Sequence, residues 1–101
     1  MASRLNLHEV LCGILGNRNA YFQPPASLKL NYPCIVYSRE QHDITYANDN
    51  PYTHAKRYKV TIIDYDPDSP ILDKVAMLPT CKFVTSYKAD NLNHDVYELY
   101  F

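Results

Sequence analysis

Residues 56–65 carry the pattern that most restricts how this chain folds. They alternate two sets of side chains, Tyr58, Val60, Ile62 and Lys59, Thr61, Ile63. Because successive side chains of a β-strand point to opposite faces, Lys56 to Tyr65 is predicted to be a strand that carries one set on each face. Cys34 to Arg39 is rich in β-branched and aromatic residues, and is predicted to pair with it as a hairpin.

Two further strands are predicted in the C-terminal half. They run from Lys82 to Ala89 and from Asp95 to Phe101, with Asp90 to His94 as the loop that joins them. Residues 17–33 contain Pro24 and Pro25 and show no clean period, which indicates an extended loop. Within that loop, the segment 20–22 leaves room for a short edge pairing.

Two helices are predicted from periodicity and end signals. The first has one apolar face made by Leu7, Val10, Leu11, Ile14, Leu15. Ser3 or Asn6 would cap its start, and Gly16 fits the left-handed position after its end. The second begins at Asp68 or Ser69, has Pro70 in its first turn, and ends before Pro79. Its apolar face is Ile71, Val75, Leu78.

These elements predict one α+β domain over residues 1–101. A chain of 101 residues is too short to bury two separate cores. We expect a four-stranded, mainly antiparallel sheet, with the N-terminal helix and the short second helix packed on one face.

The most metal-like motif is the alternation of Asp64, Asp66 and Asp68, as in the start of a calcium loop. The remaining positions do not fit, since Ser69 stands where the loop needs glycine and Val75 where it needs a bidentate glutamate. We therefore interpret the segment as a turn before a helix, with no metal. With Gly13 and Gly16 as the sole glycines, no phosphate-binding loop can be built.

Catalytic chemistry has little support in the sequence. The cysteines and histidines are widely spaced, without a zinc pattern: Cys12, Cys34, Cys81 and His8, His42, His54, His94. We expect the thiols to be small buried groups and the histidines to be exposed. A nucleophile made from Cys34 or Cys81 and a distant histidine is the enzymatic alternative. The prediction is a protein that is not an enzyme and needs no cofactor.

Composition and charge favour a protein that binds protein. The formal net charge is −1, with eleven acidic residues against ten basic ones, which argues against free nucleic acid as the main partner. Ten tyrosines suit surfaces that become buried on assembly, although tyrosine also favours strands. No signal peptide or membrane-spanning run is found, so we expect a soluble protein with no membrane partner, made in the cytoplasm.

Three stretches together carry a resemblance to a known family. They are NAYFQPPASLKLNYPCIVYS, KRYKVTIIDYDPDSPILDKVAMLP and FVTSYKADNLNHDVYELYF. From Tyr21 to Phe101 the chain resembles the small tail-completion or tail-terminator proteins of long-tailed bacteriophages. The order of helix, strand pair, helix, strand pair is similar to that family's fold, and none of the shared motifs is catalytic.

The resemblance implies a virion assembly protein of the tail or neck, made in the host cytoplasm. It implies a ring of copies of the chain, typically six, at the head-proximal end of the tail tube. That ring would end tube polymerisation and support head-tail joining. The implied partners are the chain itself, the tail tube protein and the head-tail connector or stopper protein, with DNA only passing through the lumen.

Two loops are the candidate interfaces, from the residues alone. One is a hairpin arm around residues 46–54, with candidate contacts Tyr46, Asp49, Asn50, Tyr52, His54. The other is the loop before the last strand, with candidate contacts Asp90, Asn91, Asn93, His94.

Two alternatives stay open. The chain would equally suit another neck component, such as a head-completion or stopper protein. From a different class, a Tyr-rich module could bind a protein or single-stranded nucleic acid, with Lys56, Arg57, Lys59, Lys82, Lys88 beside Tyr58 and Tyr87. Against that second reading, a solvated strand face is the simpler interpretation of these basic residues.

Overall fold

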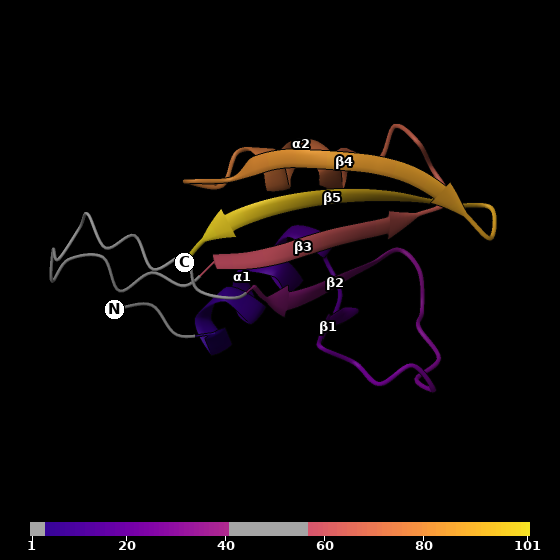
Figure 1. Cartoon of the computed structure of the whole chain (residues 1–101), viewed down its shortest axis with the longest axis horizontal. Coiled ribbons are helices and arrows are strands. Elements are labelled where there is room, and N and C mark those ends of the chain that lie inside the picture. The colour runs from indigo at the N-terminus through magenta and orange to yellow at the C-terminus, as the bar shows by residue number, and fades with distance from the viewer. Residues whose placement is uncertain (1–3, 41–56) are drawn as a thin grey trace, which may run out of the picture.

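The computed structural model describes residues 4–40 and 57–101, which form two helices and five strands (Figure 1). In chain order the elements are α1 (Arg4–Leu15), β1 (Ala20–Phe22), β2 (Cys34–Arg39), β3 (Arg57–Asp64), α2 (Pro70–Ala76), β4 (Lys82–Ala89) and β5 (Leu92–Tyr100). The α+β class that the sequence predicts is confirmed. Of these two helices, neither is long and apolar enough to cross a bilayer.

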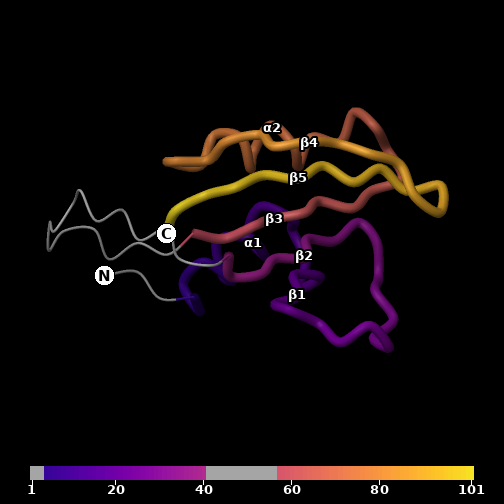
Figure 2. The backbone as a smooth tube through the Cα atoms, in the orientation of Figure 1, coloured from indigo at the N-terminus to yellow at the C-terminus, as the bar shows by residue number. Residues whose placement is uncertain are grey.

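The strands make one mixed sheet in the order β1-β2-β3-β5-β4. The predicted hairpin is present, because β2 runs antiparallel to β3 with Cys34 opposite Ile63 and Arg39 opposite Tyr58. β5 pairs with β3 and with β4, both antiparallel, and β4 forms one edge. Figure 2 shows β4 and the segment between β1 and β2 on opposite sides of the sheet.

The expectation of four strands is wrong, because β1 adds a fifth strand parallel to β2. Ile35 donates its backbone N–H to the Asn19 carbonyl at 3.0 Å, and Gln23 donates to the Tyr37 carbonyl at 2.9 Å. Ala20 is buried, so water does not reach its backbone groups. Pairing with β2 gives such groups the hydrogen-bond partners that they need. The sequence left a short edge pairing open at residues 20–22, and the structure confirms it, but three residues give too short a pattern to predict the partner or the direction.

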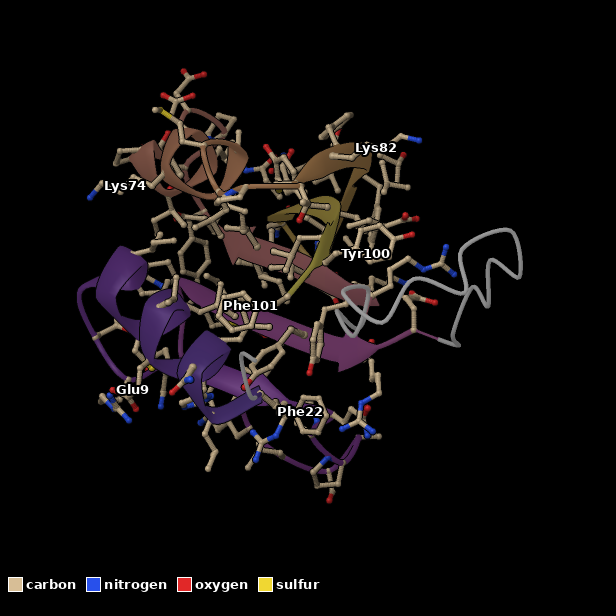
Figure 3. The ribbon with its side chains drawn as sticks, turned by 90° about the vertical axis from the view of Figure 1, so that its left-hand side faces the viewer. Glu9, Phe22, Lys74, Lys82, Tyr100 and Phe101 are labelled. Carbon is tan, nitrogen blue, oxygen red and sulfur yellow. The ribbon has the colours of Figure 1, made fainter. Side chains whose placement is uncertain are left out.

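Both helices pack on the same face of the sheet. α1 contributes Leu7 and Leu11 to the core, and α2 contributes Ile71 and Val75. The sheet contributes the fully buried alternating side chains of its central strands, Ile35, Tyr37, Tyr58, Val60, Ile62 and Leu99. The alternation predicted for residues 58–63 is therefore confirmed. Figure 3, which looks along the sheet, shows Phe22 and Phe101 in this layer and Glu9 on the outer side of α1.

The opposite face holds a smaller apolar cluster of Cys34, Ile63 and Leu92. Tyr21, Leu30, Tyr32 and Val36 pack against it, and two of them come from the extended segment before β2. That segment folds back over one end of the sheet and covers the cluster.

The helix ends follow the sequence signals in part. Gly16 has φ 77°, the left-handed conformation predicted after the first helix, and its N–H bonds to the Cys12 carbonyl. Asn6 lies inside α1 and is not its cap, because the helix already includes Arg4, while Ser3 is outside the described residues. Ser69 caps α2 with its hydroxyl, as predicted.

Candidate interaction surface

β4 is the most exposed regular element of the described chain. Seven of its eight positions are exposed, and Ala89 is half-buried. Three large apolar side chains lie open to water, with exposed fractions of 52% for Phe83, 44% for Val84 and 52% for Tyr87. Exposed edge strands of this length and character are uncommon in monomers, because their free backbone groups pair with other chains. We call β4, with Lys82 and Lys88 near its ends, the β4 edge.

Aromatic contacts to β5 hold the side chains of the β4 edge in place. The Phe83 ring meets the Tyr97 ring edge-on, with centroids 5.4 Å apart. The Tyr87 ring stacks on the His94 ring, with centroids 4.7 Å apart and planes 13° from parallel. The pairing register shifts between Phe83 and Thr85, which marks a β-bulge at Val84. One aromatic neighbour thus holds each of Phe83 and Tyr87 in place, and both rings remain about half exposed to solvent.

The tip of the β4–β5 hairpin is shorter than the sequence indicated. We expected a loop over Asp90 to His94, but only Asp90 and Asn91 lie between the strands. Both have positive φ, 52° and 63°, the conformation of a two-residue type I′ turn. Asp and Asn tolerate this conformation, so no longer loop is needed, and burial of Leu92 draws the next residues into β5.

The four predicted interface residues of this hairpin have different surroundings. Asp90 and Asn91 are exposed at the tip. Asn93 donates its side-chain amide to the carbonyls of Asp64 and Tyr65, which ties the hairpin to the end of β3. His94 stacks on Tyr87. Asn93 and His94 therefore support the surface from within, and Asp90 and Asn91 stay open for contact.

A hollow of about 300 Å³ lies beside the β4 edge. It is lined by Pro67, Ser86, Tyr87, Lys88, Asn93, His94 and Asp95. Partial burial raises the pKa of the Asp95 carboxyl, and the neighbouring His94 opposes that rise. The mixture of an amine, a carboxyl, an amide and rings suits the polar rim of a protein contact.

The other predicted interface, the arm, lies outside the described residues. Its candidate contacts were Tyr46, Asp49, Asn50, Tyr52 and His54, all within residues 41–56. They stay a prediction from the sequence.

The expectation that the histidines are exposed is wrong for His8 and His94, which are both half-buried. His8 Nδ1 lies 2.7 Å from the Tyr37 hydroxyl, and Arg4 donates to the same hydroxyl at 3.4 Å. The Arg4 guanidinium also lies 4.5 Å from the centre of the Phe22 ring. These contacts fix the start of α1 on the sheet, a long-range arrangement that no local pattern predicts. His42 and His54 lie outside the described residues.

Cys34 and Cys81 sit in surroundings that suppress thiol reactivity. Cys34 is fully buried, and burial, with a smaller effect of Asp64, raises the pKa of its thiol to about 12. Burial also raises the pKa of the Cys81 thiol. A thiol must ionise to act as a nucleophile, so neither group is poised for that role.

The aspartate motif forms the turn that the sequence predicts. Asp64 accepts the backbone N–H of Asp66, and Asp66 accepts that of Asp68. In residues 4–40 and 57–101, no three side chains of the His, Cys, Asp and Glu types gather as a metal site would need. Of the basic and aromatic residues considered for nucleic-acid binding, Tyr58 is buried in the core, whereas Lys82, Tyr87 and Lys88 are exposed on β4.

Sequence reasoning missed Phe83 and Val84 as surface residues. Their segment reads as an ordinary half-buried strand, and its position at the sheet edge follows from strand order alone. Leu5 and Leu28 were missed in the same way, with exposed fractions of 64% and 43%. Leu5 is next to Arg4 at the start of α1, and Leu28 is between β1 and β2, so both lie on the side of the sheet away from β4.

The chain matches no protein-family model, no curated protein and no solved structure.

Proposed function

We propose that this chain is a virion assembly protein that forms a closed ring on the head-proximal end of a phage tail tube. The ring, of six copies, ends tube polymerisation and offers a face to the head-tail connector or stopper protein. DNA passes through its lumen. The protein acts as a structural subunit and not as an enzyme.

One observation carries the proposal: large apolar side chains are exposed both on the β4 edge and on two segments beside β1, at the other border of the sheet. The β4 edge presents Phe83, Val84 and Tyr87, and the β1 side presents Leu5 and Leu28. A closed ring needs head-to-tail contacts, in which one surface of each copy meets a different surface of the next. Two unlike apolar surfaces on opposite sides of the subunit supply that requirement.

The edges also differ in length and direction, in a way that suits neighbouring subunits. β4 has eight residues and β1 has three. β1 runs parallel to β2, and each of the next three pairings is antiparallel, so β4 points opposite to β1. When copies are related by rotation about an axis along the strands, β4 of one copy and β1 of the next are antiparallel, the favoured arrangement.

Growth of tail tubes in vitro tests the proposal. Tail tube protein is polymerised with and without this chain, and tube lengths and ends are measured by negative-stain electron microscopy. We expect shorter tubes that carry a ring at one end only. Tubes of unchanged length without terminal density would refute the proposal.

Three substitutions connect the assay to the two edges. Phe83→Ser on the β4 edge and Leu28→Ser on the β1 side each remove one half of the contact and should each restore long tubes. Met77→Ser is the matched control, because Met77 is 84% exposed at the end of α2. If all three variants lost the ability to stop tube growth to the same extent, the two edges would have no specific role in the contact.

A second candidate has one observation in its favour. The β4 edge combines Tyr87 with Lys82 and Lys88, a mixture that also suits a single-stranded nucleic acid. Retention of the chain on a single-stranded DNA column at moderate salt would favour this candidate. Absence of retention would remove it.

A further inference from the structure

We propose that the hollow lined by Ser86, Asn93 and Asp95 is a binding site for an arginine side chain of a partner protein. Asp95 is the group that pairs with the guanidinium. The hollow has a volume of about 300 Å³, and we call it the Asp95 hollow. This inference goes beyond the proposed function, because the binding that it expects does not require a ring.

The strand register places three polar side chains of the hollow on one face of the sheet. Asp95 lies opposite Ile62 of β3 and opposite Ser86 of β4, and residues opposite each other in antiparallel strands share a face. Asn93 is two residues before Asp95 in β5, so it shares that face too. Ile62 belongs to the core beneath the helices, so this is the helix side of the sheet. Pro67, between β3 and α2, forms another wall, and Figure 1 shows its segment at the same end of the sheet as the β4–β5 turn.

The hollow offers hydrogen-bond acceptors that the described residues leave without a donor. Asp95 is half-buried, yet no group in the described part of the chain donates a hydrogen bond to its carboxylate or forms an ion pair with it. Asn93 donates its amide N–H groups to the carbonyls of Asp64 and Tyr65, at 3.3 and 3.1 Å, which leaves its side-chain oxygen as an acceptor. The Ser86 hydroxyl is exposed and can accept as well.

A carboxylate in these surroundings favours a cationic partner. Burial of a charged carboxyl without a compensating partner is unfavourable, which is why the pKa of Asp95 is raised. A guanidinium beside it would replace the interactions lost with water, because charge-assisted hydrogen bonds are roughly twice as strong as neutral ones. The Asp95 carboxylate is therefore unfavourable for folding of the free chain and favourable for binding of a cation.

The size and the walls of the hollow suit one long side chain of a protein. Small-molecule sites usually enclose about 300–1,000 Å³, so the Asp95 hollow is at the lower limit of that range. Its acceptors come from two strands, and the planar fork of arginine, with its five N–H donors, can reach several of them at once. Pro67 and Tyr87 give the aliphatic stem an apolar wall. A protein is the expected source, because Tyr87 also belongs to the exposed β4 edge, and both tyrosine and arginine are enriched in protein interfaces.

Lys88 also lines the hollow, and its charge would favour an anion instead. Lys88 is exposed and forms no ion pair in the described part of the chain, and its flexible stem lets the ammonium group stay in water. The half-buried Asp95 carboxylate is the less solvated of the two charges, so it gains more from a partner. The hollow therefore favours a cation, and Lys88 lowers its affinity for one.

An NMR titration of the isotopically labelled chain with a capped glycine–arginine–glycine peptide tests the site. We expect the peptide to shift the backbone amide signals of Ser86, Asn93 and Asp95. The matched control peptide has citrulline in place of arginine, which keeps the shape of the side chain and removes its charge. It should bind roughly tenfold more weakly. Equal binding of the two peptides, or no shift of these signals, would overturn the proposal.

Substitutions of single charges give an independent measurement with the same arginine peptide. Asp95→Asn should raise the dissociation constant roughly tenfold, and loss of the fold does not explain that result, because the substitution removes an unfavourably buried charge. Asp73→Asn is the matched control, since Asp73 is exposed on α2 and does not line the hollow. Lys88→Met removes a like charge and should lower the dissociation constant roughly twofold to fivefold. An unchanged constant for Asp95→Asn, or one for Lys88→Met that is not lowered, would contradict the assignment.

Failure of the site and failure of the proposed function are separable. If the arginine peptide binds through Asp95 but the original chain does not stop tube growth, the site stands and the proposed function fails. If the original chain stops tube growth but the peptide does not bind, the proposed function stands and the site fails.

Discussion

Tyr37→Phe removes one hydroxyl group from the centre of the contact between α1 and the sheet. Tyr37 is fully buried, and its hydroxyl lies 2.7 Å from His8 Nδ1 and 3.4 Å from the Arg4 guanidinium. The substitution keeps the aromatic ring, so the ring contacts with Phe22 at 5.1 Å and Tyr58 at 6.3 Å persist. What is lost is the hydrogen bonding of α1 to the middle of β2.

The magnitude follows from the surroundings of the partners. A neutral hydrogen bond contributes about 0.5–1.5 kcal/mol net, and an unsatisfied buried partner costs about 1–3 kcal/mol. His8 is half-buried, so water reaches part of its ring and recovers part of that cost. We therefore expect Tyr37→Phe to lower the free energy of unfolding by about 1–2 kcal/mol.

Urea denaturation followed by far-ultraviolet circular dichroism measures this loss. Tyr65→Phe is the matched control, because Tyr65 is 65% exposed and the same atom is removed. The control should stay within about 0.5 kcal/mol of the original chain. In thermal unfolding, each kcal/mol lowers the Tm by about 4–8 °C for a domain of this size. If Tyr37→Phe loses no more stability than Tyr65→Phe, the reasoning about His8 and Arg4 is refuted.

Three further predictions concern single groups. Ser69→Ala removes the hydroxyl that accepts the Ile71 N–H at 3.3 Å, and should lower the free energy of unfolding by about 0.5–2 kcal/mol, measured by urea denaturation. An unchanged urea midpoint would show that this cap does not stabilise the fold. Cys34 should resist a maleimide at pH 8 in the folded protein and react in urea, because burial raises its thiol pKa to about 12. Peptide mass spectrometry measures the labelling, and rapid labelling of the folded protein would contradict the burial of this thiol. Asp95→Asn should raise the free energy of unfolding at pH 7, since burial raises the carboxyl's pKa and the folded state therefore favours the protonated form. That gain should shrink as the pH falls below the unfolded pKa, where the original carboxyl is protonated in both states, and a gain independent of pH would reject this cause.

Much of the fold was predictable because it depends on local patterns. Alternation over residues 58–63 divided their side chains between the two faces of the strand, and a hairpin was the simplest way to pair that strand with residues 34–39. Gly16 and Ser69 marked helix ends, since their roles depend on local backbone geometry. The bounds of β4 were predicted correctly, whereas β5 begins three residues earlier than expected.

The candidate site was predicted less well, because the exposure of a residue depends on whether distant segments of the chain pack over it. Asp90 and Asn91 were predicted and lie exposed at the hairpin tip. Asn93 and His94 were predicted too, but their side chains bond or stack within the molecule. Phe83 and Val84 were missed, because a strand with apolar residues has the same sequence pattern at an edge as in the middle of a sheet.

The sequence by itself determined the type of each main element and the division of the alternating side chains between two faces, because propensity and periodicity act over a few residues. Only the tertiary structure decided the strand order, the parallel addition of β1, and the contact of Tyr37 with His8, 29 residues away in the chain. These features depend on which surfaces remain unpaired after the local elements have formed. The exposed β4 edge, on which the proposed ring depends, belongs to this second group.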